Sequence, residues 1–315
     1  MEIYPWHAKT WRRLFGIINE GRVPHAWVLS GPLYTGKSKF AKQLSFALLC
    51  ERRREEGACG QCRSCRLAVQ GAHPDFLHIK IPEQKQEIGI DAVREMTSQA
   101  MLTRQLAAYK TIIIEPLDAM GLSAANALLK ILEEPPEGTV FISITHRRSA
   151  VLPTIMSRCQ RIDLPAPARK NALRWLHTQI AEERVEELLD AAEGLPLRAL
   201  QLSEDRDILN LRANLRRDLS ALMRGHLAPL EAAKEWSNAP LDETVAWMLS
   251  LGHNLIKQCM SDPASAPKLD VRALYAILDE VAEAKRALAE RANLNGTLML
   301  ETLALAWAGA ARQER

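Results

Sequence analysis

The nine residues Ser30-Gly31-Pro32-Leu33-Tyr34-Thr35-Gly36-Lys37-Ser38 decide the fold of the N-terminal part of the chain, because they fit the pattern G-x-x-x-x-G-K-[ST]. An apolar run, Ala26 to Leu29, precedes them, and apolar residues with helical spacing follow at Phe40, Leu44 and Leu48. A strand, a glycine-containing loop and a helix in this order are the context of a phosphate-binding loop.

The expected chemistry of this loop is nucleotide binding. Gly31 and Gly36 would let backbone N–H groups turn toward the phosphates, and the following helix N-terminus would favour the negative charge. Lys37 would reach the terminal phosphates and Ser38 would hold Mg²⁺. The cofactor expected from the pattern alone is therefore ATP with Mg²⁺.

Length and composition set broad limits on the class of protein. At 315 residues the chain is expected to form more than one domain, and its 47% hydrophobic content is ample for packed cores. The formal charge of +3 is too small to indicate a polyanion partner by itself. The sequence contains no long uncharged apolar run and no basic-then-apolar leader, so we expect a cytoplasmic protein without a membrane span.

Four of the six cysteines lie close together in the sequence. Cys50, Cys59, Cys62 and Cys65 have the spacing C-x8-C-x2-C-x2-C. Two cysteines separated by two residues chelate one ion from a tight turn, and four thiolates complete the tetrahedral shell that zinc prefers. The pattern predicts a structural Zn²⁺ site with no position left open for catalysis; a set of free buried cysteines is the alternative.

Strands and helices are expected to alternate over the first half of the chain. The β-branched run Thr111 to Ile114 is too continuous for an edge strand and predicts a strand buried on both faces. Alternation of this kind predicts a parallel sheet wrapped by helices. The other expected strands are 26–29, 76–81, 140–145 and 160–164, and the expected helices are 10–20, 37–50, one from 92 capped by Asp91, 123–132 and a turn at 154–158.

The second half of the chain reads as helical. A linker at Pro165-Ala166-Pro167 precedes short helices between 171 and 202, and from residue 207 onward apolar stripes have helical spacing. We therefore expect an α/β domain (1–165) containing the cysteine module (50–65), a small helical domain (166–206) and an all-α domain (207–315). Tryptophans 175, 236, 247 and 307 fall on apolar helix faces and are expected in cores or subunit contacts.

Several motifs carry a resemblance to a known family. They are Tyr4-Pro5-Trp6, His25-Ala26, the loop from Gly31 to Ser38, the four cysteines, His73-Pro74-Asp75, residues 91–95, residues 125–130, Leu132-Glu133-Glu134-Pro135-Pro136 and Ser157-Arg158-Cys159. In this order the sequence resembles the AAA+ clamp-loader subunits of bacterial DNA polymerase III. The resemblance rests on specific motifs over the first 200 residues and on helical layout beyond them.

The resemblance implies a P-loop AAA+ domain followed by a helical lid and a helical collar. It also implies assembly into a ring with the gamma/tau ATPases and the delta subunit, which loads the sliding clamp on primed DNA as part of the DNA polymerase III holoenzyme. Within the family, the Tyr-Pro-Trp opening and the Gly-x-Pro-x-Arg form around Arg198 favour a non-motor subunit over the gamma/tau motor.

Two departures from the motor pattern predict that ATP is bound weakly or not at all and that there is little or no hydrolysis. AAA+ motors place Asp-Glu after the strand at 111–114, whereas Glu115 takes the Asp position here and Pro116 takes the Glu position. Proline can neither accept a proton nor orient water, and Asp118, three residues on, is a poor substitute for the missing base. Tyr34 stands where motors usually carry glycine, so its side chain would resist a positive φ and crowd the phosphates.

The resemblance assigns roles to three further residues. Arg158 becomes an arginine finger that reaches the nucleotide site of a neighbouring subunit, since a planar, permanently charged fork pairs with phosphate oxygens. Without the resemblance, it is a surface arginine after a short helix. Thr145 and Arg198 take the two sensor positions, or are structural.

Two other classes of function remain to be weighed. An active gamma-type ATPase motor is favoured by the phosphate loop and opposed by Glu115-Pro116; a small-molecule P-loop kinase leaves the helical C-terminal region unexplained. Glu133-Glu134 is interpreted as a solvated helix end, or a partner for a neighbouring subunit's basic groups, and not as a catalytic carboxylate pair.

Overall fold

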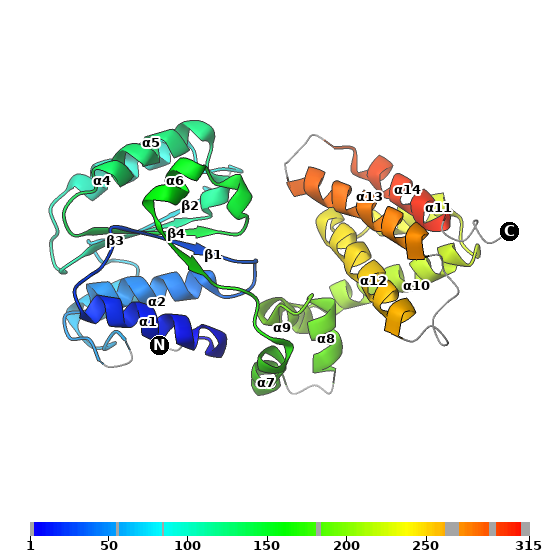
Figure 1. Cartoon of the computed structure of the whole chain (residues 1–315), viewed down its shortest axis with the longest axis horizontal. Coiled ribbons are helices and arrows are strands. Elements are labelled where there is room, and N and C mark those ends of the chain that lie inside the picture. Colours follow the sequence, from blue (N-terminus) through cyan, green and yellow to red (C-terminus); the bar gives the residue numbers. More distant parts are fainter. Residues whose placement is uncertain are drawn as a thin grey trace. The chain divides into compact units, whose positions relative to one another are not determined.

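The computed structural model describes residues 3–54, 57–83, 85–180, 184–261, 271–289 and 294–309. The chain forms two compact units, one made of residues 1–181 with 194–198 and the other of residues 182–193 with 199–315 (Figure 1). We call them the N-terminal and the C-terminal unit. The three-domain division expected from the sequence stays a prediction.

A five-stranded parallel sheet forms the centre of the N-terminal unit. Its strands are β1 (Ala26–Ser30), β2 (Phe76–Lys80), β3 (Lys110–Glu115), β4 (Thr139–Thr145) and β5 (Gln160–Asp163), in the order β2-β3-β4-β1-β5. All neighbours are parallel, and Ser30 at the end of β1 pairs with Thr145 at the end of β4. The carboxyl ends of the strands therefore meet at one edge, as the alternating pattern predicts.

Helices cover both faces of this sheet (Figure 1). On one face lie α1 (Ala8–Asn19), α2 (Lys37–Leu49) and α3 (Arg63–Val69); on the other lie α4 (Ile90–Met101), α5 (Leu122–Glu133) and α6 (Pro153–Arg158). Alternate residues of β3 enter the two cores: Ile113 packs on the α1–α2 side, and Ile112 and Ile114 pack on the α4–α5 side. The prediction that this strand is buried on both faces is confirmed.

One expected helix start is wrong. Asp91 does not cap a helix that begins at Ala92; α4 begins at Ile90, and Gly89 is its N-cap with an extended backbone. Asp91 lies in the first turn, where its side chain is 84% exposed and pairs with Arg94 at 3.8 Å. The carboxylate therefore faces solvent and supports the helix through charge, without a capping hydrogen bond.

The remaining helices lie beyond the sheet. They are α7 (Arg169–Gln179), α8 (Val185–Ala191), α9 (Pro196–Glu204), α10 (Arg206–Met223), α11 (Pro229–Trp236), α12 (Leu241–Ser261), α13 (Val271–Ala289) and α14 (Gly296–Gly309). Helices α10–α14 share one core in which Trp236, Trp247 and Trp307 are buried, as their spacing predicts. Trp175 instead packs edge-on against the rings of Tyr4 and Trp6. None of the described helices is long and apolar enough to cross a membrane.

A buried carboxylate organises the segment between α4 and β3. Asp75 is fully buried, and its oxygens accept hydrogen bonds from the backbone N–H groups of Gln105, Leu106 and Ala107 at 2.8–2.9 Å. Burial alone would raise the pKa of Asp75, but these three donors outweigh it and hold the pKa below its usual value. The ionised side chain thus fixes the backbone that leads into β3.

We expect Asp75→Asn to destabilise the protein by about 3 kcal/mol, because the amide has one acceptor oxygen for three buried N–H groups. The stabilisation by Asp75 is fully present above the pKa of an unfolded aspartate. It is lost as the pH falls through the lower folded-state pKa, so the two proteins should converge in acid. Urea unfolding at a series of pH values measures this. Asp91→Asn is the matched control on an exposed carboxylate, and an equal effect of the two substitutions would contradict the assignment.

Candidate functional site

The phosphate loop joins β1 to α2, the context that its sequence predicts. Tyr34 and Gly36 both have positive φ, 59° and 89°, so the loop needs left-handed backbone at a position occupied by tyrosine. Gly31 lies against Leu164, the residue that directly follows β5. A Cβ atom at Gly31 would stand 2.0 Å from the carbonyl oxygen of Leu164. The departure noted at Tyr34 therefore falls at a position whose backbone favours glycine.

Lys37 is turned back onto its own loop. Its ammonium group donates hydrogen bonds to the carbonyl oxygens of Gly31, at 2.8 Å, and Pro32, and the residue is only 3% exposed. Burial lowers the pKa of Lys37 to about 8, while the nearby charges of Asp118 and Glu115 oppose the shift. The charge expected to meet a phosphate is thus satisfied by backbone oxygens of the same loop.

The predicted magnesium ligand Ser38 is engaged with the end of β3. Its hydroxyl donates to the carboxylate of Glu115, and His78 Nε2 lies 3.1 Å from the second oxygen of the same carboxylate. Burial would raise the pKa of Glu115, but the hydrogen bonds from His78 and Ser38 hold it below its usual value. The sequence analysis missed His78; the parallel register pairs Lys80 with Glu115 and so places His78 on the same face.

Asp118 is committed to the end of β4. It lies in a short 3-10 helix, Leu117–Ala119, and accepts hydrogen bonds from Thr145 Oγ1 at 3.0 Å and from the backbone N–H of His146 at 2.8 Å. Arg147 Nε lies 3.6 Å from its other oxygen, and the side chain is 6% exposed. The predicted sensor Thr145 therefore contacts Asp118, and Pro116 supplies no carboxylate beside Glu115.

Aromatic residues near the N-terminus pack on the outside of the phosphate loop. Trp6 Nε1 and His7 Nε2 lie 2.9 and 2.7 Å from the carbonyl oxygen of Thr35. Burial lowers the pKa of His7 to about 4, so at neutral pH the uncharged ring donates this hydrogen bond. Sequence reasoning missed His7, because no motif marks it.

The second predicted sensor also contacts the loop. Arg198, the third residue of α9, lies over the ring of Tyr34 with its guanidinium carbon 5.3 Å from the ring centroid. Both residues belong to the N-terminal unit. Such a cation–π contact favours this position of the Tyr34 ring. Gly31, Gly36, Lys37, Ser38, Glu115, Thr145 and Arg198 are therefore gathered around the phosphate loop and the adjoining strand ends.

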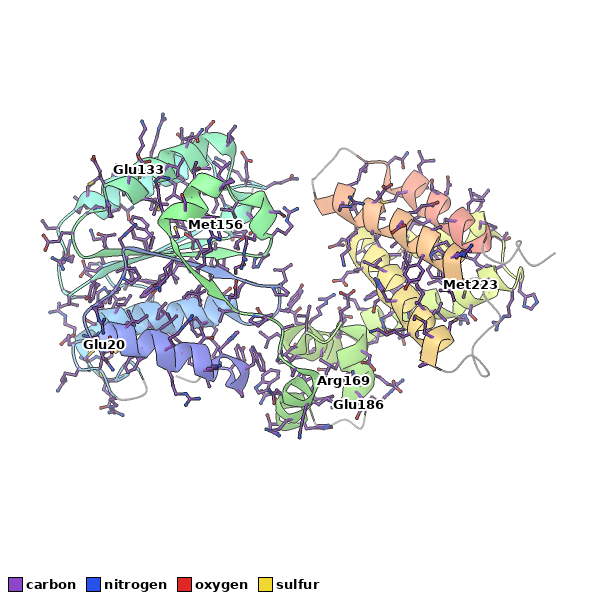
Figure 2. The ribbon with its side chains drawn as sticks, viewed as in Figure 1. Glu20, Glu133, Met156, Arg169, Glu186 and Met223 are labelled. Atoms are coloured by element: carbon purple, nitrogen blue, oxygen red, sulfur yellow. The ribbon has the colours of Figure 1, made fainter. Side chains whose placement is uncertain are left out.

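Arg158 lies apart from this group. It is the last residue of α6, and its guanidinium donates to the carbonyl oxygen of Thr154 at 3.0 Å and pairs with Glu133 at 2.6 Å. Figure 2 labels Glu133 on α5 and Met156 on the neighbouring α6. The Arg158 side chain is 36% exposed, so the fork is accessible at the rim of the α5–α6 layer.

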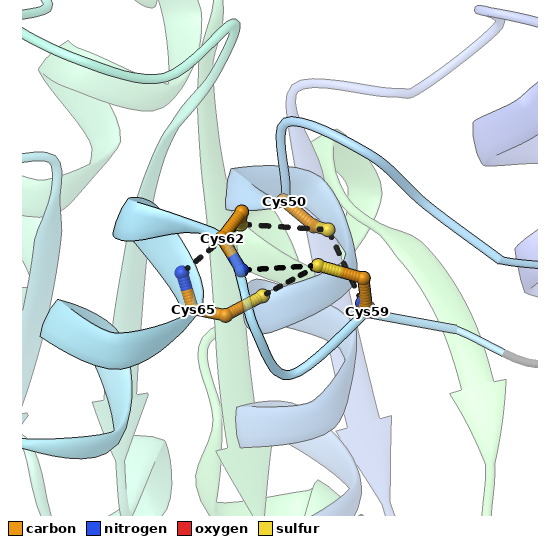
Figure 3. Close-up of side chains that lie close together, drawn as sticks. All are labelled: Cys50, Cys59, Cys62 and Cys65. Atoms are coloured by element: carbon orange, nitrogen blue, oxygen red, sulfur yellow. Dashed lines mark hydrogen bonds between the residues drawn. The ribbon is translucent and has the colours of Figure 1, made fainter.

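The four cysteines converge, as their spacing predicts (Figure 3). Their sulfur atoms all lie within 4.8 Å of one another, with Cys50–Cys62 at 4.0 Å and Cys59–Cys65 at 3.9 Å. Sulfurs bound to one tetrahedral zinc stand about 3.8 Å apart, given Zn–S bonds of ~2.3 Å. These distances are far too long for disulfides and fit a shared ion. The cluster can hold a metal ion.

Backbone N–H groups donate hydrogen bonds to three of these sulfurs. Cys59, Cys62 and Cys65 donate their N–H groups to Cys50, Cys59 and Cys62 Sγ respectively, each at 3.3 Å. Hydrogen bonds from the N–H groups of Gln61 and Cys62 lower the pKa of Cys59 to about 6. Burial raises the pKa of Cys50 and of Cys65, so the N–H groups favour the thiolate most clearly at Cys59.

Comparison with known proteins identifies the family. The chain matches the family model described as DNA polymerase III, delta subunit, over residues 6–168. The DNA polymerase III subunit delta' of Pseudomonas aeruginosa is 33% identical over 98% of this chain and 98% of its own length. The DNA polymerase III subunit tau of Bacillus subtilis is 31% identical over only 56% of this chain and 32% of its own.

Among solved structures, a DNA polymerase III gamma subunit-related protein of Thermotoga maritima aligns with 97% of this chain and 100% of its own. That alignment has a TM-score of 0.49 and 21% identity. The curated delta-prime relative matches nearly the whole chain, whereas the curated tau relative matches about half of it. The chain therefore belongs to the family of DNA polymerase III delta-prime subunits.

Proposed function

We propose that this protein is a non-hydrolysing subunit of a DNA polymerase III clamp loader in the bacterial cytoplasm. It assembles with gamma/tau ATPases and a delta subunit, and the assembly loads the sliding clamp on primed DNA. The observation that carries the non-motor assignment is the residue pair Glu115-Pro116 at the end of β3. A motor needs a carboxylate at the second position to polarise the attacking water, and proline has none.

The contacts around the phosphate loop support the same proposal. Asp118 is the nearest alternative base, but Thr145 and His146 already donate hydrogen bonds to it. Lys37 is held by the carbonyl oxygens of its own loop, and Tyr34 is held in place by Arg198. Nucleotide binding has to displace these contacts, so ATP with Mg²⁺ would bind weakly and remain intact. Bound Mg²⁺ would supply charge neutralisation at the phosphates, with Ser38 and Glu115 as the residues placed to hold it.

The role assigned to Arg158 is to act in trans. A guanidinium fork presents two parallel donors to phosphate oxygens and cannot lose its charge. Arg158 is partly exposed at the end of α6, and its ion pair with Glu133 connects two half-exposed side chains. Such a pair is worth about 0–1 kcal/mol, so the fork can leave Glu133 for a phosphate on a neighbouring subunit at little cost.

The metal proposed for the cysteine cluster is zinc. A closed set of four thiolates is typical of structural Zn²⁺ and leaves no ligand position for water or substrate. Zinc would stabilise the fold of residues 50–65 and take no part in nucleotide chemistry. This proposal rests on the sulfur–sulfur distances, which match a tetrahedral site.

We expect about one zinc per chain, since one set of four thiolates forms one tetrahedral site. Elemental analysis after purification without chelator measures it. Cys62→Ser should lose the metal and lower thermal stability, whereas Cys259→Ser, a half-buried cysteine on α12 outside the cluster, should retain it. A fully folded wild-type protein without metal would refute the zinc site.

We expect the isolated protein to bind ATP weakly and to release no phosphate above background, because Pro116 removes the base. Tyr34→Gly should strengthen binding of a fluorescent ATP analogue by relieving the positive φ and the crowding. Tyr34→Phe is the control: it keeps the ring and the backbone cost, and should bind as wild type does. Magnesium-dependent phosphate release that disappears in Lys37→Ala would instead favour the gamma-type motor.

Arg158→Ala should leave folding and ring assembly intact and lower the DNA- and clamp-stimulated ATPase of the reconstituted loader. The loss should be partial, because other subunits serve the remaining sites, although a finger can be worth ~10³–10⁵ at its own site. Arg158→Lys should rescue poorly, since it lacks the bidentate fork. Arg161→Ala removes the same charge from an exposed position on β5 and should retain full activity. Wild-type ATPase and clamp loading by an intact Arg158→Ala ring would make Arg158 a structural surface residue.

A further inference from the structure

The cysteine module carries a concentration of arginines that the proposed function does not use. We define the module as residues 50–69, from Cys50 to the end of α3. It contains five arginines and no lysine, and all five are exposed: Arg52, Arg53, Arg54, Arg63 and Arg66. Its carboxylates are Glu51, whose side chain accepts the N–H of Ser64 at 2.9 Å, and Glu55 and Glu56, which lie outside the described residues.

Two of these arginines donate hydrogen bonds to one glutamine, and a third lies one helical turn from one of them. Arg54 Nη2 donates to Gln61 Oε1 at 3.3 Å, and Arg66 Nη1 donates to the backbone oxygen of Gln61 at 3.2 Å. Arg63 precedes Arg66 by three residues on α3, so the two side chains share one face of that helix. We call Arg54, Arg63 and Arg66 the Gln61 arginine cluster.

The charge of this cluster is not neutralised within the described part of the chain. None of its three guanidiniums forms an ion pair with a described carboxylate, whereas arginines on other helices do, as Arg94 does with Asp91 and Arg286 with Glu283. Each guanidinium has five N–H donors, and the contacts to Gln61 use one donor each from Arg54 and Arg66. The other donors of these exposed side chains have no partner among the described residues, and all three side chains carry the same charge.

Hydrogen bonds hold the backbone that carries the Gln61 arginine cluster. Arg63 and Arg66 each follow directly after a cysteine of the metal-binding set, and the N–H···S hydrogen bonds tie these turns together. Arg53 anchors the other side of the module by donating to the carbonyl oxygen of Ile18 in α1 at 3.3 Å. Placing three guanidiniums that have no ion pair to a described carboxylate on one small module costs like-charge repulsion, which a polyanion relieves.

We propose that the Gln61 arginine cluster binds the phosphate backbone of a nucleic acid strand directly. The planar guanidinium fork matches two phosphate oxygens, and an all-arginine set suits a row of phosphates better than isolated point charges do. The module packs on α2, on the opposite side of the sheet from α5 and α6 (Figure 1). This surface is therefore separate from Arg158, and the proposal does not depend on ATP turnover or on the finger.

Fluorescence anisotropy with labelled oligothymidine of about 20 nucleotides, and with a duplex of the same length, tests the proposal over a range of salt concentrations. The triple substitution Arg54→Gln, Arg63→Gln, Arg66→Gln should weaken binding of the single strand at about 50 mM salt by about tenfold or more. It should also reduce the slope of log K against log salt by about 2, since each lost phosphate contact removes ~0.7. Arg63→Gln alone should reduce it by ~0.7, which keeps the test decisive if the triple variant fails to fold.

The matched control removes the same net charge elsewhere. Arg94, Arg217 and Arg286 are 70–73% exposed and each already pairs with a carboxylate, so changing all three to Gln should leave affinity and slope near wild type. If both triple variants lost the same affinity for the oligonucleotide, the loss would come from the change in net charge alone, and the proposal would be overturned. Wild-type protein that binds neither probe would also overturn it. Binding of a labelled polyglutamate peptide at the cluster, tighter than that of either oligonucleotide, would overturn it in favour of an acidic protein partner.

Discussion

The close approach of Gly31 to β5 is the constraint on which the rest of the nucleotide site depends. The Ser30 carbonyl accepts the Leu164 N–H at 2.7 Å, and a side chain on Gly31 would collide with the Leu164 carbonyl oxygen. The residue that follows β1 must therefore lack a side chain, because its backbone lies between the ends of β4 and β5. This fixes the Gly31 and Pro32 carbonyl oxygens where Lys37 can reach them, and α2 then starts next to the end of β3, where Ser38 meets Glu115.

The elements of the fold could largely be predicted because their signals are local. The β-branched run of β3 and the cysteine spacing each determine a structure with few alternatives, and both appear as expected. The start of α4 could not be predicted in this way. Asp91 is a good capping residue by type, but the chain is already helical at Ile90, so its carboxylate points to solvent. Residue preference is a weak guide when a neighbouring glycine can also begin the helix.

The contacts inside the candidate site were harder to predict, because they join segments that are distant in sequence. His78 reaches Glu115 only through the parallel register of β2 and β3, and His7 reaches Thr35 only because the first turn of the chain packs on the loop. The pattern G-x-x-x-x-G-K-[ST] specifies that Lys37 lies in a phosphate loop. It does not specify whether a ligand or the loop itself accepts the lysine's hydrogen bonds, since that depends on where Gly31 and Pro32 direct their carbonyl groups.

The hydrogen bonds from Lys37 to the carbonyl groups of its own loop bear on how strongly a nucleotide could change the conformation of such a subunit. A ligand shifts a protein between two shapes only to the extent that it binds one of them better. When a lysine is already satisfied by its own backbone, much of the phosphate's attraction is offset by the contacts it has to break, and little remains to drive a change of shape. In the proposed assembly, such a subunit would keep one conformation while the neighbouring ATPases turn over. It would then be the part that stays rigid, because nucleotide binding would not change its shape.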